Sequence, residues 1–419
     1  MCWLITAVFL GLASLSAWLL NPLDQTAWRV SLNVPWLGSV KLRAEPILQL
    51  ATSLPVRTLL HRVHWQSRYG VLYLQNTDDG FAIDCLECRF HLPELSKYPI
   101  QFDKLSLEVP DNNQPLSGWL ELYSGQALAR ISYQGKLTSQ GINLVWSLPK
   151  TPLKYLLKPL QSQSAIFRQV KVTGTLAATG TLKWPSRHWS VKPDLQGFAV
   201  SGLDTEQLNS AELKYHCPTT PALQNPPAYA WVNEKDMGRW LAKAVLLAED
   251  ANFTQHPGYD MSTLRYLLAQ ENHTKLPGGS TISQQLAKYF FTGGERYWLR
   301  KIEELLYAVE MENTLGKRRI FALYLNTVDW GPGICGAAQA ASVYFGRKPS
   351  ELSAAQAAWL AGIIRNPHRA WRKEYLPQMP DVERLSWVLG FMPKKVQRLP
   401  LALKFTEYLG NQTSLALLK

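Results

Sequence analysis

The spacing of apolar residues changes near the middle of this 419-residue chain and divides it into two parts. From about Trp28 to Tyr215, apolar and polar residues mostly alternate, as they do from Phe102 to Val109. These short runs are separated by Gly, Asn and Pro, a pattern typical of antiparallel sheets. The sequence therefore predicts a β-rich domain over residues 28–216, with a helical insertion at 153–160, and a structural or partner-binding role for it.

A proline-rich stretch follows the alternating part. Residues 217–227 contain four prolines, which remove backbone donors, so we predict a linker there. Beyond it, apolar residues recur at helical spacing, as at Trp240, Ala244, Leu247 and Ala248. The sequence predicts a mainly α domain over 228–375 and a C-terminal extension over 376–419. The predicted fold class is therefore α+β and multidomain.

The N-terminal residues 1–23 carry no charged side chain. Residues 3–20 are apolar apart from three hydroxyl residues, and a run of this length can cross a bilayer as a helix. Trp3 and Trp18 lie near its ends, where amphipathic rings favour the membrane interface. We expect a transmembrane anchor over 1–23. The alternative is a cleaved signal peptide, although no basic residue precedes the apolar run.

Charge and cysteine content exclude some classes of function. The formal net charge of +12 favours an anionic partner, but no nucleic-acid-binding motif is present, so nucleic acid is not expected. Cys85 and Cys88 form a CxxC pair without the second pair that a zinc site needs. In an oxidising compartment they can form a local disulfide, with Cys217 as an alternative partner.

Five short blocks occur in order between residues 246 and 367. They are 248–258 (Ala-Glu-Asp-Ala-Asn-Phe-Thr-Gln-His-Pro-Gly), 278–285 (Gly-Gly-Ser-Thr-Ile-Ser-Gln-Gln), 300–304 (Arg-Lys-Ile-Glu-Glu), 324–326 (Tyr-Leu-Asn) and 365–367 (Arg-Asn-Pro). In this order and spacing the chain resembles the family 51 glycosyltransferases, the peptidoglycan transglycosylases. The resemblance covers about 140 to 170 residues and implies a lysozyme-like helical catalytic domain.

The resemblance implies a reaction between two lipid-linked saccharides. The donor is a growing glycan chain on undecaprenyl pyrophosphate, and the acceptor is lipid II. Such an inverting transfer needs a general base at the acceptor hydroxyl. It also needs cations and hydrogen-bond donors around the departing pyrophosphate.

Glu249 is the candidate base. It ends an apolar helical run, so its carboxylate can be partly shielded from water. In the family, the first Glu of a Glu-Asp-x-x-Phe block is the catalytic base, and this block matches Glu249, Asp250 and Phe253. Without the other blocks, two acidic residues at this position would be taken for a helix end in solvent. His256 is expected to order the loop by hydrogen bonding and not to carry protons.

The remaining site residues surround the predicted pyrophosphate. Lys288, Arg296, Arg300 and Lys301 supply positive charge, and Ser280 or Thr281 can cap the helix that follows the glycine loop. The resemblance implies substrate contacts from the following residues: Asp250, Gly279, Ser280, Thr281, Gln284, Gln285, Lys288, Arg296, Arg300, Lys301 and Asn326.

Glu304 corresponds to the second essential carboxylate of the family. It can orient the cations or hold a divalent ion such as Mg or Mn at the pyrophosphate; no cofactor is certain and the residues specify no metal site. Arg300 and Glu304 stand four residues apart, so the plain alternative is an intrahelical ion pair worth a few tenths of a kcal/mol.

The fourth block departs from the family pattern. The family has Glu where this chain has Ala322, which raises doubt about rate but leaves Glu249 and Glu304 in place. Three basic residues, Lys317, Arg318 and Arg319, precede it. They either face a membrane or form an ordinary solvated surface.

These features together predict a monofunctional peptidoglycan glycosyltransferase. About fifty residues follow Pro367, and no Lys-Thr-Gly set accompanies a nucleophilic serine, so no transpeptidase is expected. The expected location is the inner membrane, single-pass, with the catalytic domain on the periplasmic side. Expected partners are lipid II, the lipid-linked glycan, the membrane and, through the β-rich domain, other cell-wall synthesis proteins. The alternatives are a lysozyme-like hydrolase and a catalytically weakened membrane scaffold.

Overall fold

The computed structural model describes residues 28–34, 38–51, 58, 64–78, 80–91, 96–110, 116–210, 230–269, 279–293, 298–370 and 387–391. The chain divides into two compact units. The sheet unit comprises Met1–Ala199 and Ser262–Pro277, and the helical unit comprises Val200–Met261 and Gly278–Lys419. The predicted anchor at 1–23 and the predicted linker at 217–227 lie outside the described residues. In the ranges given above, no helix has the length and apolarity needed to cross a membrane.

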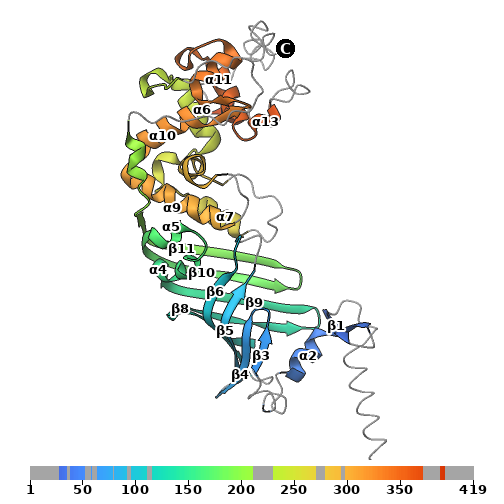
Figure 1. Ribbon diagram of the computed structural model, residues 1–419. Coiled ribbons are helices and arrows are strands. Elements are labelled where there is room, and N and C mark those ends of the chain that lie inside the picture. The colour runs from blue at the N-terminus through green and yellow to red at the C-terminus, as the bar shows by residue number, and fades with distance from the viewer. Residues whose placement is uncertain are drawn as a thin grey trace, which may run out of the picture. The chain divides into compact units, whose positions relative to one another are not determined.

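The sheet unit is built on one nine-stranded antiparallel sheet in which every strand pairs with its neighbours in the chain (Figure 1). The strands are β3 His64–Ser67, β4 Gly70–Thr77, β5 Gly80–Phe90, β6 Ile100–Pro110, β7 Leu116–Ser124, β8 Gln126–Thr138, β9 Gly141–Pro152, β10 Lys171–Trp184 and β11 His188–Ser201. Short turns with a Gly in the turn or next to it join β3 to β4, β4 to β5, β7 to β8 and β8 to β9, so these strands pair with their neighbours in the chain. The predicted β-rich, antiparallel character is confirmed.

Short helices interrupt the meander between β9 and β10. They are α4 Leu153–Leu156, the 3-10 turn η1 Lys158–Leu160 and α5 Ala165–Gln169, so the predicted helical insertion is confirmed. Leu153, Leu160 and Phe167 are buried. A smaller hairpin, β1 Arg29–Val34 with β2 Gly38–Arg43, precedes the main sheet and leads into α2 Ala44–Ala51.

The two faces of the main sheet differ in character because neighbouring residues in a strand point to opposite sides. One face carries an apolar cluster around Ala129, Leu148 and Ala178, against which Trp146 packs. Gly180 lies under the Trp146 ring: a Cβ at this position would stand 2.6 Å from the ring. On this face the Trp146 ring therefore packs over a glycine.

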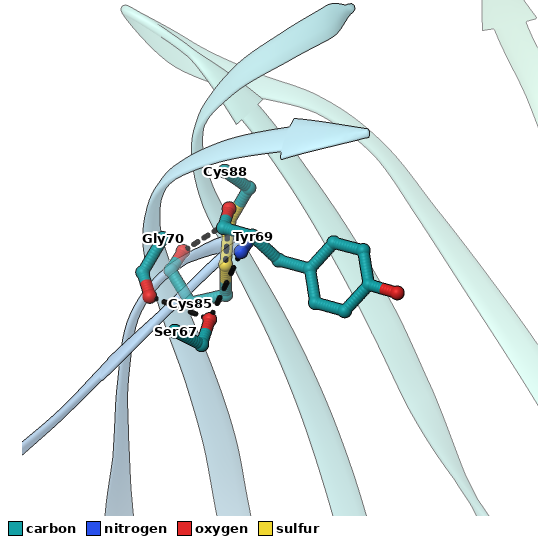
Figure 2. The surroundings of a disulfide bond; sticks show 5 residues. All are labelled: Ser67, Tyr69, Gly70, Cys85 and Cys88. Carbon is teal, nitrogen blue, oxygen red and sulfur yellow. Dashed lines mark hydrogen bonds between the residues drawn. A yellow bond between two sulfur atoms is a disulfide. The ribbon is translucent and has the colours of Figure 1, made fainter. Parts of the chain in front are cut away.

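Cys85 and Cys88, both in β5, form a disulfide, as predicted for this CxxC pair (Figure 2). The turn from β3 to β4 lies beside it, closed by the Ser67 hydroxyl, which donates to the Gly70 carbonyl at 2.7 Å. Cys335, in the helical unit, is also disulfide-bonded. Such bonds are typical of proteins in oxidising compartments.

The helical unit is mainly α, as predicted. Its longer helices are α6 Arg239–Glu249, α8 Ile282–Ala287, α9 Trp298–Thr314, α10 Gly316–Thr327, α11 Gly336–Phe345 and α12 Ala354–Ile363. Shorter elements are η2 Thr205–Asn209, η3 Glu234–Asp236, η4 Phe253–Gln255, the π-helical η6 Lys288–Thr292, η7 Pro349–Glu351, α13 Pro367–Ala370 and the strands β12 Asp329–Gly331 and β13 Ile334–Cys335. Helix α7, Met261–Ala269, begins in this unit and continues into the sheet unit. The fully buried core includes Leu241, Leu286, Leu306, Leu323 and Trp330.

Residues 200–210, the last two residues of β11 and the segment after it, belong to the helical unit. The buried carboxylate of Glu310, on α9, accepts hydrogen bonds from the backbone N–H of Leu203 at 2.9 Å and from that of Thr205 at 3.3 Å. Arg319, on α10, donates to the carbonyls of Leu208 and Ser210. These bonds explain why this segment packs with the helices although the sequence pattern groups it with the strands before it.

Candidate active site

Glu249 is the last residue of α6, and its carboxylate is held by a second helix. Gln285, on α8, donates from Nε2 to Glu249 Oε2 at 3.0 Å. Tyr324, which is fully buried on α10, donates from its hydroxyl to Gln285 Oε1 at 2.9 Å. Both polar atoms of the Gln285 amide are thereby engaged, so its orientation is fixed. The half-buried Glu249 carboxylate is oriented by a chain that starts in the helical core.

The neighbouring carboxylate, Asp250, has different contacts. Its oxygens lie 2.9 and 3.1 Å from His256 Nε2, and Oδ2 accepts from the Ile282 N–H at 2.9 Å. The Gly258 N–H donates to His256 Nδ1 at 3.3 Å, while Nε2 is the ring atom that faces the Asp250 carboxylate. Asp250 and His256 are buried and together connect the loop after α6 to the start of α8. His256 thus has the ordering contacts that the sequence predicts.

We expect Asp250→Asn to lower the free energy of unfolding by about 1–3 kcal/mol, since an amide cannot accept from both donors and its NH2 would oppose the His256 N–H. Urea unfolding followed by circular dichroism measures the change. An unchanged midpoint would show that this carboxylate does not hold the loop.

Thr281 and Gln284 begin helix α8. Thr281 is the N-cap: its hydroxyl accepts from the Gln284 N–H, and the Gln284 side chain accepts from the Thr281 N–H, forming a capping box. The Thr281 hydroxyl also donates to the Gly258 carbonyl at 2.7 Å. The predicted capping role of Thr281 is therefore confirmed. The substrate contacts predicted for these two side chains compete with hydrogen bonds that they already make.

Three charged residues on α9 form a compact cluster. Glu304 is fully buried, and its oxygens lie 2.7 Å from Arg300 Nη1 and 2.5 Å from Lys301 Nζ. Lys301 also donates to the Ser280 hydroxyl at 3.0 Å, and Arg300 donates to the Gly293 carbonyl. The i, i+4 ion pair that was the plain alternative for Arg300 and Glu304 is present. Its predicted worth of a few tenths of a kcal/mol does not apply, because that value describes exposed pairs and this carboxylate is buried.

Lys288 lies within the electrostatic reach of this cluster. It opens the π-helical segment η6 directly after α8. The surrounding protein atoms and then the Arg300 charge lower the pKa of Lys288 from its ordinary value of 10.5. An ammonium group with a lowered pKa is short of compensating negative charge, which is the condition expected of a group that binds an anion.

Two other predicted site residues, Asn326 and Gly279, do not take part in the Glu304 cluster. Asn326 is buried and makes three backbone contacts: it accepts from the Val232 N–H and donates to the carbonyls of Val232 and Ala322. These bonds fasten the segment before η3 to α10. Gly279 is exposed at the start of the α8 loop. Arg296 lies outside the described residues.

The three basic residues before Ala322 have partners within the helical unit, and of the three only Arg318 is exposed. Lys317 donates to the His256 carbonyl at 2.6 Å and to Glu312 at 2.8 Å, and it lies over the Phe253 ring. Arg318 pairs with Glu234 at an exposed position, and Arg319 binds the segment after β11. Lys317 therefore supports the loop that follows Glu249.

Residues missed by the sequence analysis include Tyr324 and Glu312. Glu312 accepts from both Ser283 and Lys317, so it joins α8 to the Phe253–His256 loop. Tyr324 lay inside the recognised Tyr-Leu-Asn block, but nothing in its spacing pointed to Gln285. Such contacts between distant blocks arise from helix packing.

The surroundings of Glu304 do not favour its candidate metal role. Both of its oxygens already face cations, and among the described side chains no group of three or more His, Cys, Asp or Glu is placed to hold a metal. The described side chains around Glu304 therefore do not fit a divalent ion.

Comparison with known proteins agrees with this arrangement. The family model described as transglycosylase matches residues 219–392. A biosynthetic peptidoglycan transglycosylase of Alcanivorax borkumensis is 41% identical over 191 residues, which cover 43% of this chain and 76% of that protein. The corresponding protein of Nitrosomonas eutropha is 42% identical over 168 residues, covering 36% and 68%. That of Bordetella pertussis is 43% identical over 145 residues, covering 33% and 60%.

The helical unit and its clustered motif residues thus define a transglycosylase. The chain belongs to the transglycosylase family. The matched region begins at residue 219, so the sheet of the first unit lies outside it.

Proposed function

We propose that this chain is a peptidoglycan glycosyltransferase that polymerises lipid II into glycan strands. One observation carries the proposal: a carboxylate and a cation cluster contact the same short segment, residues 280–285. Glu249 accepts from Gln285, and Lys301 donates to Ser280. A base and positive charge close to one helix start are what transfer from a pyrophosphate donor needs.

In the proposed reaction, Glu249 removes the proton from the 4-hydroxyl of the glucosamine unit of lipid II. The freed oxygen forms a bond to the anomeric carbon of the growing chain. The bond from that carbon to the pyrophosphate oxygen breaks, and undecaprenyl pyrophosphate leaves with the electron pair. Attack opposite the leaving group inverts the anomeric configuration.

Positive charge stabilises the departing pyrophosphate in this scheme. We assign this task to Arg300, Lys301 and Lys288, and by family resemblance to Arg296. Arg300 offers a planar fork for phosphate oxygens, and Lys301 a compact charge that also reaches Ser280. Glu304 acts as a positioning residue, since it holds both cations from the buried side of α9. Ser280, Gln285 and Gly279 are proposed to contact the substrate.

We further propose a single-pass anchor over residues 1–23 in the inner membrane, with a lysozyme-like catalytic domain on the periplasmic side. The apolar N-terminal run and the polyprenyl substrates support the membrane location. The disulfides at Cys85–Cys88 and Cys335 support an oxidising compartment.

Incubation with two substrates separates this function from hydrolysis. The full chain in detergent is expected to convert purified lipid II into long glycan polymer, measured by gel electrophoresis of labelled product, and to leave finished peptidoglycan intact. A lysozyme-like hydrolase would release fragments from finished peptidoglycan and form no polymer. The cation cluster favours transfer, because hydrolysis of a glycosidic bond has no pyrophosphate to stabilise.

A scaffold without activity is the second candidate, favoured by Ala322 in place of the family's Glu. At this position the backbone carbonyl of Ala322 accepts from Asn326, and Glu249 and Glu304 keep their partners. Measurable polymer from wild-type protein would exclude the scaffold.

A further inference from the structure

The face of the main sheet opposite the apolar cluster of Ala129, Leu148 and Ala178 contains a hollow of about 490 Å³, which lies outside the catalytic unit. Its size is within the range of small-ligand sites, roughly 300–1,000 Å³. Strands β6 to β9 form it (β6, β8 and β9 are labelled in Figure 1). Nothing in the proposed transfer reaction uses this surface.

Strand register places its side chains side by side. Ser117, Gln134 and Val145 are directly paired across β7, β8 and β9, and so are Trp119, Ser132 and Ser147. Paired residues point to the same face of a sheet, so these two rows share one face. The small serines leave the space that the larger Trp119 and Val145 enclose.

Trp119 is the aromatic wall of the hollow. The Arg130 guanidinium lies 4.1 Å from the centre of its ring, and Arg130 is itself held by Glu121 at 3.1 Å. Arg130 and Glu121 are paired on the row adjoining Trp119, on the side away from Ser117 and Gln134. One face of the indole ring is thus covered, which leaves the opposite face towards the hollow.

The floor of the hollow is fixed from the other side of the sheet. Tyr133, on β8, crosses β7 at Gly118 and donates to the Glu108 carbonyl on β6. A Cβ at residue 118 would stand 2.9 Å from the Tyr133 hydroxyl, so glycine is required there. Burial, followed by the nearby Glu108 charge, raises the pKa of Tyr133 to about 12, so the hydroxyl keeps its proton and donates even at moderately alkaline pH. Three strands are tied together, and a preorganised site loses less entropy on binding.

The chemistry of the lining selects one class of ligand. Among the residues that line the hollow, all in the described part of the chain, none is Lys or Arg, and Glu108 is acidic. This disfavours nucleic acid, phosphate and anionic headgroups. The Ser132 hydroxyl donates to the Ser147 carbonyl at 3.3 Å and can still accept a hydrogen bond, while the Gln134 amide can both donate and accept. The half-exposed indole offers an apolar face. A neutral sugar ring presents hydroxyl groups at its rim and C–H groups on its faces, and matches both features.

We propose that this hollow, bounded by Trp119, Gln134 and the three serines, is a binding site for the uncharged sugar backbone of a β-linked glycan chain. Its ligand is the strand made by the helical unit, and this choice of ligand rests on the proposed function. The site would hold product on the sheet unit while the catalytic unit extends it.

Photo-crosslinking tests the site directly. The full chain in detergent is irradiated with a photoactivatable hexamer of β-1,4-linked N-acetylglucosamine, and labelled peptides are mapped by mass spectrometry. Label is expected on β7 to β9. Trp119→Ala should reduce it about tenfold, the equivalent of one lost ring contact. Gln134→Leu, at an exposed position, should reduce it severalfold without affecting folding.

Trp184→Ala is the matched control, because Trp184 is another exposed tryptophan of the same sheet with an arginine over its ring, and it lies outside the hollow. Absence of label from β7 to β9, or equal loss in both tryptophan variants, would overturn the site. Lipid II polymerisation is measured on the same samples. Label on the sheet from a chain that makes no polymer would overturn the proposed function and support a sugar site with a different source of glycan.

Discussion

Glu249→Gln is expected to reduce lipid II polymerisation by about 10²- to 10⁴-fold, the usual contribution of a general base. A glutamine cannot remove the proton from the acceptor hydroxyl at neutral pH. Its amide oxygen can still accept the hydrogen bond from Gln285, so the α6–α8 contact is retained. The initial rate of polymer formation from labelled lipid II measures the effect.

Stability provides the internal check on this variant. Glu249→Gln should change the free energy of unfolding by less than about 1 kcal/mol, because a half-buried carboxylate is replaced by a group of the same shape. Asp250→Asn, one residue further on, is expected to behave in the opposite way and lose stability. A near-normal polymer yield from Glu249→Gln would contradict the assignment of Glu249 as the general base.

Glu304→Gln is expected to have the second largest effect, and on both stability and activity. Glu304 is fully buried and faces two cations, so losing its charge leaves Arg300 and Lys301 uncompensated. Breaking a buried ion pair in this way costs about 3 kcal/mol; the lower part of the usual range applies because Lys301 is 40% exposed and can reach water. The cations would also shift from the pyrophosphate position, which should lower the polymerisation rate at least about tenfold.

The matched control is Glu234→Gln, which breaks an exposed ion pair with Arg318 in the same unit. It should change unfolding by less than about 1 kcal/mol and leave polymerisation unchanged. Urea unfolding and polymer yield, measured on both variants, give the comparison. Equal behaviour of the two variants would contradict the positioning role of Glu304.

Sequence patterns predicted the architecture well where local chemistry decides it. The alternating runs form the strands of the meander, because consecutive strands joined by short turns pair with one another. Helical spacing at Trp240, Ala244 and Leu247 became α6. The boundary between the units was harder to predict: residues 200–210 look like a strand end, yet Glu310 and Arg319, more than a hundred positions away, bind them to the helices.

Site residues were harder to predict than elements. Glu249 and Asp250 are adjacent and chemically similar, and the sequence assigned both to substrate chemistry. Helix α6 ends between them, so their carboxylates have different partners. Glu249 accepts a hydrogen bond from Gln285, whereas Asp250 contacts His256 and accepts from the Ile282 N–H. Asn326 lies in a recognised block but faces Val232.

The sequence by itself determined three things. The order of the motifs indicated the family and the reaction class, and the periods of the apolar residues indicated the two types of secondary structure. These depend on residue type and spacing, which the sequence contains. The tertiary structure alone decided which of several polar neighbours contact one another, and that a tryptophan, a glutamine and three serines from three strands line one hollow. Helix packing and strand register bring distant residues together, and neither is encoded in any one segment.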